Sequence, residues 1–307
     1  MFRLVASVFM GWSLGSNATA NAFGTAVFSK TIRYRTAIIL AAVFIILGAF
    51  LEGREGMETL SGLVRQTRDS AFIASLASAL TVFLMTVLRI PVPGPQAAVG
   101  AILGIGLVIG RVDLPDLTKI VACWITTPIL AMITSAVLYP LLAKGIDRLG
   151  LNIFTRDYTM KIGLLVAGSY AAYALGANNV ANVTGVFINT GQLTVLQGAL
   201  LGGASIALGS LTYSKNVMKT VGRNLVKLDP YSALVSVLSM ALVAHFYAKL
   251  GVPVSTSQGI IGSVLGIGLV KGIQTINPKT LFSILMGWLG TPLVALVLSF
   301  ALFRLFF

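Results

Sequence analysis

The sequence predicts an all-α integral membrane protein made of two homologous halves, arranged as an inverted repeat. Three observations carry this prediction: long apolar runs, very few charged residues, and a set of motifs that recurs after about 160 residues. Hydrophobic residues make up 56% of the 307 residues, and charged residues only 10%. A soluble domain carries about 25% charged residues, so a chain this apolar could not cover a water-facing surface.

Six apolar runs hold almost no charge, and several approach the roughly 20 residues that a helix needs to cross a bilayer. Backbone groups inside lipid must pair within their own segment, so these runs are expected to be helices. The runs are 37–51, 71–88, 120–143, 162–175, 232–248 and 281–307. We therefore expect a multi-pass protein of the cell membrane that is embedded in the lipid bilayer.

The few charged residues are mostly basic, with 22 Lys and Arg against 9 Asp and Glu, for a net charge of +13. The basic residues lie in the breaks between apolar runs, as in loops that face anionic lipid headgroups. This distribution favours membrane topology over nucleic-acid binding. All nine acidic residues lie outside the long apolar runs.

Several classes of catalytic and cofactor site have no counterpart in the sequence. Cys123 is the only cysteine and His245 the only histidine, so neither an internal disulfide nor a multi-histidine metal site can form. The sequence has no phosphate-binding glycine loop, catalytic triad or paired carboxylates. We expect a protein that is not an enzyme and has no cofactor, apart from a sodium ion or a proton as coupling ion.

The strongest signal is an internal repeat. The pattern Gly-x-Asn-x-x-Ala-Asn-x-x-Gly occurs at 15–24 and again at 176–185. A second pair follows at nearly the same spacing, with PVPGPQ at 91–96 matching PVSTSQ at 253–258. A third pair is a Trp-x-x-Thr-Pro element that begins at Trp124 and at Trp288. These pairs divide the chain into a first repeat, 1–149, and a second, 150–307, which we expect to form one transport unit.

Each half contains about five apolar segments, and an odd number would place the two copies in opposite orientations across the membrane. That is the inverted-repeat architecture of many secondary transporters. The stretches 96–110 and 258–270 are short and rich in glycine, which favours half-helices that re-enter the membrane. The prediction is about ten transmembrane or re-entrant helical segments, with broken helices at the repeated motifs.

The asparagine motif places polar side chains inside apolar runs. The first glycine of each copy would allow the helix to break, and an asparagine could cap the new helix start. Asn17 and Asn21 are four residues apart and would share one helix face, as would Asn178 and Asn182. Their amides offer N–H groups to an anion and C=O groups to a cation. One such pair could serve only to join helices, but two equivalent pairs favour a transport site.

The proline motif predicts a helix start that binds an anion. After Pro253, hydroxyl groups can cap a new helix, whose first backbone N–H groups have no partner. With the helix dipole, these groups make a site for a tetrahedral oxyanion. The side chains expected there are Ser255, Thr256, Ser257 and Gln258, with Gln96 in the first half. The first half lacks the hydroxyl groups, so the site should be asymmetric; the alternative is a plain N-cap in a loop.

Four residues are candidates for binding a coupling ion. Histidine is the side chain that most readily changes charge near neutral pH, and His245 lies inside the run 232–248. It is a candidate proton relay, although a hydrogen-bonded structural histidine fits the sequence as well. Asn17, Asn178 and Asn179 are the candidates for coordinating a cation through their amide oxygens.

Together these motifs resemble those of the inorganic phosphate transporter (PiT) family, and the resemblance covers nearly the whole chain. It implies ion-coupled phosphate uptake, usually with sodium or protons, by an inverted-repeat helical fold with helical hairpins. Family members place substrate and cation around the two asparagine motifs and the Ser/Thr helix starts. Carried over to this sequence, the implied binding residues are Asn17, Asn21, Gln96, Asn178, Asn182, Ser255, Thr256, Ser257 and Gln258.

The sequence departs from the family pattern at two positions. The family typically has an aspartate directly after the first asparagine, where this chain has Ala18 and Asn179. A hard cation prefers charged oxygen ligands, which argues against sodium coupling. A carboxylate can accept a hydrogen bond from the proton of hydrogen phosphate. Sulfate has only acceptor oxygens, so a carboxylate beside it would repel it and would itself have no hydrogen-bond partner.

The departure favours sulfate over phosphate, and the family is similar to some bacterial sulfate permeases. We expect a secondary transporter that carries sulfate or phosphate by alternating access, with the anion at half-helix N-termini near the membrane centre. A sodium-coupled phosphate symporter is the first alternative and an anion channel on the same scaffold the second. Assembly into a homo-oligomer is compatible with such a chain.

Overall fold

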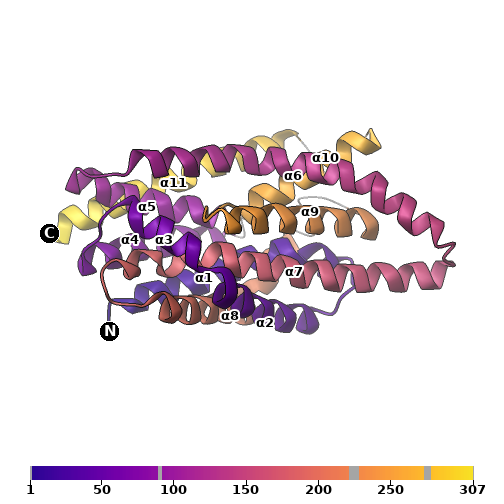
Figure 1. Ribbon diagram of the computed structural model, residues 1–307, viewed down its shortest axis with the longest axis horizontal. Coiled ribbons are helices and arrows are strands. Elements are labelled where there is room, and N and C mark those ends of the chain that lie inside the picture. Colours follow the sequence, from indigo (N-terminus) through magenta and orange to yellow (C-terminus); the bar gives the residue numbers. More distant parts are fainter. Residues whose placement is uncertain (1, 89–91, 221–227, 273–277, 307) are drawn as a thin grey trace.

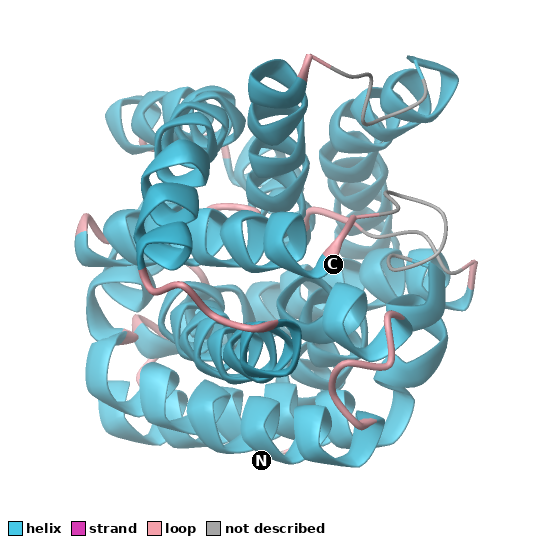
Figure 2. Ribbon diagram, turned by 90° about the vertical axis from the view of Figure 1, so that its right-hand side faces the viewer, coloured by secondary structure: helices cyan, strands magenta, loops and turns pink. Residues whose placement is uncertain are grey.

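The computed structural model describes residues 2–88, 92–220, 228–272 and 278–306; Pro91 of the proline motif lies outside these ranges. Every described element is a helix (Figure 2). The helices are α1 (Leu4–Phe28), α2 (Tyr34–Glu52), α3 (Arg54–Leu63), α4 (Arg68–Val87), α5 (Gly94–Ile109), α6 (Leu114–Arg148), α7 (Ile153–Ile188), α8 (Val195–Thr220), α9 (Pro230–Lys249), α10 (Thr256–Lys271) and α11 (Pro278–Phe306).

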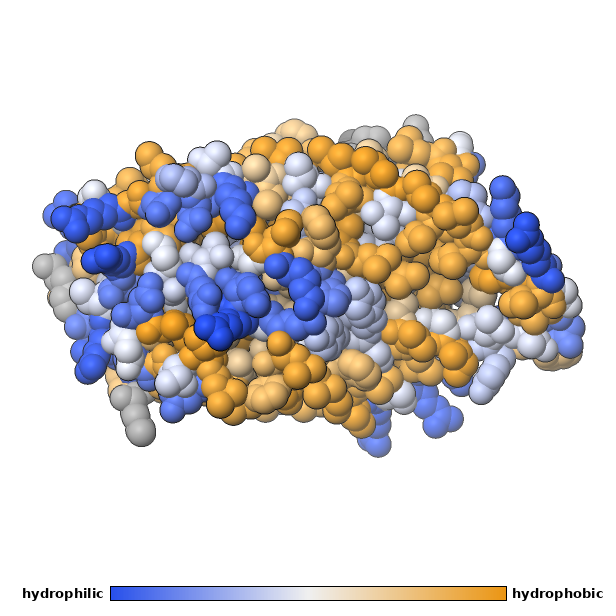
Figure 3. All heavy atoms as spheres, in the orientation of Figure 1, coloured by the Kyte–Doolittle hydropathy of each residue, from blue (hydrophilic) through white to orange (hydrophobic). Residues whose placement is uncertain are grey.

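Seven of the described helices are long and apolar enough to cross a membrane: α2, α4, α6, α7, α8, α9 and the Leu285–Phe306 part of α11. Helix α1 is long as well, but the asparagine, serine and threonine residues of its motif lower its hydropathy. Large hydrophobic side chains such as Ile125 and Val137 on α6 face outward, and apolar surface covers much of the visible face (Figure 3). The prediction of an all-α multi-pass membrane protein is confirmed.

Helices from the first part of the chain pack mainly against helices from the second part. Helix α1 packs along α8 and α2 along α7; in the same way α5 packs on α11, and α10 on α6. Figure 1 shows α6, α10 and α11 in its upper part and α1, α2 and α8 in its lower part. Each half therefore buries its helices mainly against the other half.

Glycines allow the closest of these contacts. A Cβ atom at Gly15 would lie 1.9 Å from the carbonyl oxygen of Ile206 on α8. A Cβ atom at Gly176 would lie 2.0 Å from the carbonyl oxygen of Ile45 on α2. Both positions lie inside uninterrupted helices, so the prediction that these glycines break the helix is wrong. They are required instead because the backbones approach too closely for any side chain.

The break predicted at the proline motif does occur. Helix α5 packs against α4, and α10 against α9, so each pair forms a helical hairpin. Helices α5 and α10 have 16 residues each, or about 24 Å at 1.5 Å per residue. They are therefore shorter than the roughly 30 Å hydrocarbon core of a bilayer. In Figure 1 the α4–α5 hairpin lies in the left part and the α9–α10 hairpin farther right.

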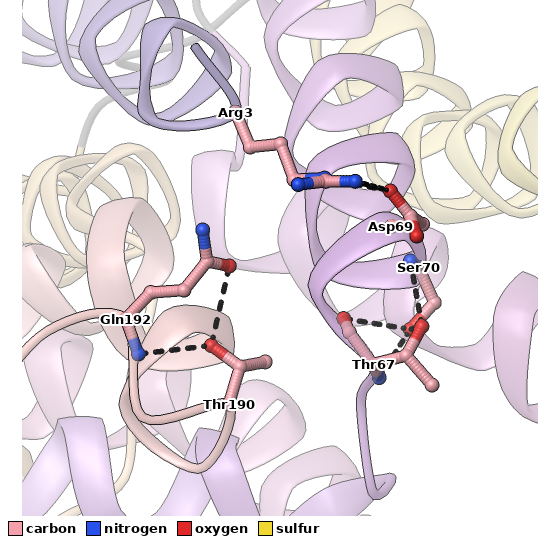
Figure 4. Close-up of polar contacts among 6 residues, drawn as sticks. All are labelled: Arg3, Thr67, Asp69, Ser70, Thr190 and Gln192. Atoms are coloured by element: carbon pink, nitrogen blue, oxygen red, sulfur yellow. Dashed lines mark hydrogen bonds and ion pairs between the residues drawn. The ribbon is translucent and has the colours of Figure 1, made fainter. Parts of the chain in front are cut away.

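The outer end of the first hairpin is held by local polar contacts (Figure 4). The hydroxyl of Thr67 accepts a hydrogen bond from the Ser70 backbone, and the Ser70 hydroxyl accepts one from the Thr67 backbone, which makes a capping box at the start of α4. Arg3, just before α1, donates to Asp69 over 2.6 Å. These contacts fix where α4 begins, and with it the position of the hairpin.

The start of the second hairpin provides a pH-dependent test. Asp229 accepts from the backbone N–H of Ser232 and from Lys271 of α10. Burial opposes ionisation, but the hydrogen bond from Lys271 and those from Ser232 outweigh it and lower the pKa of Asp229 to about 2. A depressed pKa means that the carboxylate stabilises the fold above its ordinary pKa of 3.8, and that this stability is lost as the pH falls toward 2.

We expect Asp229→Asn to lower the free energy of unfolding near neutral pH by less than about 1 kcal/mol, because the ion pair is partly exposed. The melting temperatures of the wild type and the variant, measured in detergent, should converge between pH 4 and pH 2. A difference that persists unchanged at low pH would show that the ionised carboxylate is not what stabilises this end of α9.

Candidate functional site

The first asparagine of each motif holds the tip of a hairpin. On α1, Asn17 accepts from the backbone N–H of Val92 over 3.1 Å and donates to the hydroxyl of Thr86 on α4. On α7, Asn178 accepts from the backbone N–H of Val254 over 2.9 Å. The amide of Asn178 also donates to two carbonyls of the α9–α10 hairpin. Equivalent asparagines therefore anchor equivalent hairpins, and their amides are engaged in doing so.

The second asparagine of the first motif reaches the start of α10. The Nδ2 of Asn21 lies 3.1 Å from the hydroxyl oxygens of both Thr256 and Ser257. The hydroxyl of Ser257 donates to the carbonyl of Val92, next to the first hairpin tip. Ser255 caps α10 by accepting from the N–H of Gln258, as the sequence predicts. The tips of the two hairpins therefore meet, and hydroxyl groups join them to α1.

The second motif is arranged differently from the first. Asn182 donates to Asn179 on the same helix over 3.2 Å, and does not repeat the hydroxyl contacts of Asn21. Several buried amide atoms of the predicted site residues have no hydrogen-bond partner. They are the Oδ1 atoms of Asn21 and Asn182, the Oε1 atoms of Gln96 and Gln258, and the Nδ2 atom of Asn179. A buried amide atom without a partner costs about 1–3 kcal/mol, so this group of atoms is suited to receive a polar ligand.

A small cavity lies between the hairpin tips, α1 and α7. Its lining includes Asn17, Ala18, Asn179, the first residues of α5 and the first residues of α10. Its volume of about 10 Å³ admits one water molecule, which is less than a tetrahedral oxyanion requires. The structure therefore shows this space closed to such an anion.

The electrostatics of the cavity favour an anion. Helices α5 and α10 both begin at its wall, with the positive ends of their dipoles. The lining contains no acidic side chain. Ala18 and Asn179, where the family typically has aspartate, both belong to this lining. Both residues are uncharged, so these two positions add no negative charge to the lining.

Nine of the predicted site residues, with Asn179, are brought to this one region and are at most 5% exposed. His245 is not among them. It lies on α9 at the contact with α2 and α7, between the hydroxyl of Tyr170 and the carboxylate of Glu52. It faces a separate apolar groove between α2 and α7. The sequence therefore grouped residues that the structure divides between two places.

Three polar partners in the described chain were not predicted from the sequence. Thr86 of α4 lies beside Asn17, and Tyr170 of α7 and Glu52, the last residue of α2, lie against His245. Glu52 directly follows the apolar run 37–51 and was grouped with the acidic residues outside the runs. The signal that could have revealed Glu52 is an acidic residue directly at the end of an apolar run. The Glu52 side chain is only 19% exposed.

Residues 14–299 match the sequence pattern of the phosphate transporter family. The chain belongs to this family. The resemblance drawn from the motifs is thereby confirmed, as is the expectation of a transporter that is not an enzyme.

Curated relatives match over nearly the full length of this transporter-family chain. A Methanocaldococcus jannaschii protein, provisionally named a phosphate permease, is 30% identical over 99% of this chain and 96% of its own. The sulfate permease CysP of Bacillus subtilis is 29% identical over 98% of this chain and 86% of its own. A solved structure titled "The sodium-dependent phosphate transporter" has the same fold, with a TM-score of 0.87 and 22% identity, covering 100% of this chain and 99% of the other.

The anchoring role of Asn178 in this phosphate transporter family member can be tested directly. Asn178→Ala would leave the buried N–H of Val254 without a partner, so we expect the free energy of unfolding to fall by about 1–3 kcal/mol. Thr159→Ala on the same helix is the control, because Thr159 is only partly buried and its hydroxyl bonds to its own helix. Thermal unfolding in detergent measures both. Equal melting temperatures for the two variants would contradict the anchoring role.

Proposed function

We propose that the protein is a secondary transporter that carries a tetrahedral inorganic oxyanion by alternating access, with sulfate favoured over phosphate. The observation that carries the proposal is the cavity at the two hairpin tips, where two helix N-termini meet and no acidic side chain is present. Hydroxyl and amide groups there can donate to an anion that has only acceptor oxygens. The proposed binding residues are Asn17, Asn21, Gln96, Asn178, Asn182, Ser255, Thr256, Ser257 and Gln258.

The amides without partners also suit an anion. Amide oxygen and nitrogen exchange places when the side chain rotates by 180° about its last bond, so each amide can present N–H₂. If Asn21 rotates in this way, its Oδ1 accepts from the hydroxyl of Thr256, and from that of Ser257 once the contact of Ser257 with Val92 is broken, and its Nδ2 becomes free to donate. Opening of the cavity would therefore supply donors without leaving the hydroxyls unpaired.

The packing of helices from one half against helices from the other supports an inverted repeat of the halves 1–149 and 150–307. The pairs α1–α8 and α2–α7 are equivalent under such a repeat, and so are α5–α11 and α10–α6. We infer two hairpins that enter from opposite membrane faces and meet at the centre. The contact of their tips, through Ser257 and the carbonyl of Val92, would then separate the two sides of the membrane. Movement of one hairpin at a time would give alternating access.

A sodium-coupled phosphate symporter is the second candidate. The solved structure that shares this fold is titled a sodium-dependent phosphate transporter, and the curated relatives include both phosphate and sulfate permeases. Sodium would have to be held by uncharged oxygens here, such as the amide oxygens of Asn17, Asn178 or Asn179. Because Ala18 and Asn179 replace the aspartates, we place sulfate first. A channel on this scaffold is the third candidate.

Uptake of radiolabelled sulfate and phosphate into proteoliposomes, with and without a sodium gradient, tests the proposal. We expect saturable sulfate uptake that does not depend on sodium and that phosphate does not inhibit. Saturable, sodium-driven phosphate uptake would favour the symporter instead. Fluxes that do not saturate would indicate a channel, and uptake of neither anion by folded protein would refute the proposed function.

We propose that the protein lies in the cell membrane, where its partners are the lipid bilayer and the transported anion. Assembly into a homo-oligomer would be detected by measuring the mass of the purified protein in detergent.

A further inference from the structure

A second polar cluster lies outside the anion cavity, where α2, α7 and α9 meet. The imidazole of His245 lies between two partners: its Nδ1 is 2.7 Å from the hydroxyl of Tyr170, and its Nε2 is 2.6 Å from the carboxylate of Glu52. The other oxygen of Glu52 is 2.7 Å from the ammonium of Lys249. The ring of Tyr173 meets the imidazole edge-on. These five side chains form a connected group of titratable residues in a chain that has few of them.

The repeat provides a natural comparison for this cluster. Each residue of the cluster has an equivalent in the other copy of the repeat. Tyr170 corresponds to Phe9 and Tyr173 to Trp12, whereas Glu52 corresponds to Tyr213 and His245 to Phe83. These four equivalents also gather in space as an aromatic cluster. The rings of Phe9 and Phe83 are 5.5 Å apart, and those of Trp12 and Tyr213 are 5.6 Å apart. Aromatic packing therefore suffices at this place in the fold, so support of the helices alone does not require ionisable groups.

The cluster can hold His245 in either charge state without losing a hydrogen bond. When the imidazole is neutral, the Tyr170 hydroxyl donates to Nδ1 and the Nε2–H donates to Glu52. When a proton binds Nδ1, that N–H donates to the Tyr170 oxygen instead, because a hydroxyl can both donate and accept. Glu52 remains the acceptor for Nε2 and stabilises the positive charge. A proton can therefore enter and leave while His245 keeps both of its hydrogen bonds, and the Tyr170 hydroxyl turns its own proton away from the ring.

Charged groups on the surrounding helices connect the cluster to water. The Lys249 side chain is 60% exposed, whereas those of Glu52 and His245 are 19% and 22% exposed. Hydrophilic surface covers the region of α3, where Glu55 is exposed (Figures 1 and 3). Lys119 of α6 donates to the carbonyl of Leu250, the residue after Lys249.

Two further helices touch α9 without adding charge next to His245. Helix α1 contains no titratable side chain. Helix α10 has only Lys271, which pairs with Asp229 at the other end of α9. Protonation of His245 would therefore act mainly on Glu52, Lys249 and the two tyrosines.

Hydrogen bonds of the Asn178 side chain also connect the cluster to the anion cavity. Asn178 donates to the carbonyl of Ala244, the residue directly before His245. The same amide donates to the carbonyl of Val252 and accepts from the N–H of Val254, at the tip of the hairpin. Ser255 and Thr256, the next residues, belong to the cavity lining. A shift of α9 at His245 would therefore reach the hairpin tip through one side chain.

We infer that His245, with Tyr170 and Glu52, is a proton-binding site that is coupled to anion binding at the hairpin tips. This inference rests on the proposed function, because the anion site defines what the proton is coupled to. Binding of the anion and of the proton must then influence each other equally, as linkage requires.

The single histidine makes the proton site directly observable. Protein labelled with ¹⁵N-histidine and purified through a tag without histidine gives one set of imidazole signals, all from His245. We expect these signals to change with pH as the imidazole gains and loses a proton. Saturating sodium sulfate or sodium phosphate, whichever raises the melting temperature, should shift the midpoint by about 0.5 pH or more, which corresponds to about a threefold change in proton affinity.

Two variants separate proton binding from simple structural support. Tyr170→Phe removes the hydrogen-bond partner of Nδ1 in both charge states but keeps the ring, so the response of the imidazole signals to pH should change. His245→Phe introduces the residue found at the equivalent position of the first half. We expect anion uptake by this variant to lose most of its dependence on pH between pH 5 and pH 8. Glu58→Gln is the control, because Glu58 is exposed and pairs with Arg54 outside the cluster.

The outcomes distinguish this inference from the proposed function. An imidazole that does not titrate, or a midpoint that a bound, stabilising anion leaves unchanged, would overturn the proton site while the transporter proposal stands. If neither anion stabilises the protein or is taken up, the proposed function fails, and the coupling fails with it. If His245→Phe does not fold, Tyr170→Phe and the wild-type titration decide the matter.

Discussion

We expect Gly176→Ala to destabilise the transporter severely and to abolish uptake. The added Cβ would lie 2.0 Å from the carbonyl oxygen of Ile45, well inside the contact distance of the two atoms. The obstacle is backbone rather than a flexible side chain, so α2 and α7 would have to move apart. Overpacking of this kind costs about 1–3 kcal/mol and occasionally more. We expect at least about 3 kcal/mol here, because the displaced α7 also carries Asn178 and Asn179.

The yield of monodisperse protein and its melting temperature measure this effect. Gly145→Ala on α6 is the matched control: it is the same substitution in a helix, with no atom within 4 Å of the added Cβ. Alanine at such a helix position should be neutral or stabilise by up to about 1 kcal/mol. If the Gly176 variant were as stable as the Gly145 variant, the close approach of α2 and α7 would not exist in the folded protein.

The second large effect concerns selectivity. The double substitution Ala18→Asp and Asn179→Asp restores the aspartates typical of the family at two positions of the cavity lining. We expect sulfate uptake to fall at least about tenfold, because a carboxylate facing a fully deprotonated dianion is repelled and unpaired, at a cost of about 1–3 kcal/mol. Hydrogen phosphate can donate its proton to the carboxylate, so the ratio of phosphate to sulfate uptake should rise.

Uptake of both anions by the same proteoliposome preparation measures this ratio. Asn152→Asp is the control, because Asn152 caps the start of α7 outside the cavity and aspartate caps a helix equally well. An unchanged ratio in the double variant, with folding intact, would show that the anion does not bind between the hairpin tips. The two substitutions made singly would then report which half contributes more to selectivity.

The proline motif illustrates how far the sequence could lead. Proline and glycine interrupt a helix, and a serine followed by polar residues restarts it, so the start of α10 at Thr256 follows from local chemistry. The asparagine motif illustrates the opposite case. Gly15 and Gly176 predict a break by their conformational freedom, yet both lie in continuous helices, because the missing side chain is needed for a neighbouring backbone. Local rules cannot distinguish these two uses of glycine.

The sequence by itself determined the membrane class, the repeat and nine buried polar residues that gather at one place, because hydrophobicity and motif spacing are properties of the chain alone. Only the tertiary structure decided which of these residues anchor the hairpins and which have atoms without partners. It also separated His245 from the anion cavity and placed Glu52 against it, 193 residues apart in the sequence. The physical reason is that each half buries its helices against the other half, so a contact depends on the packing of both and on no local pattern in either.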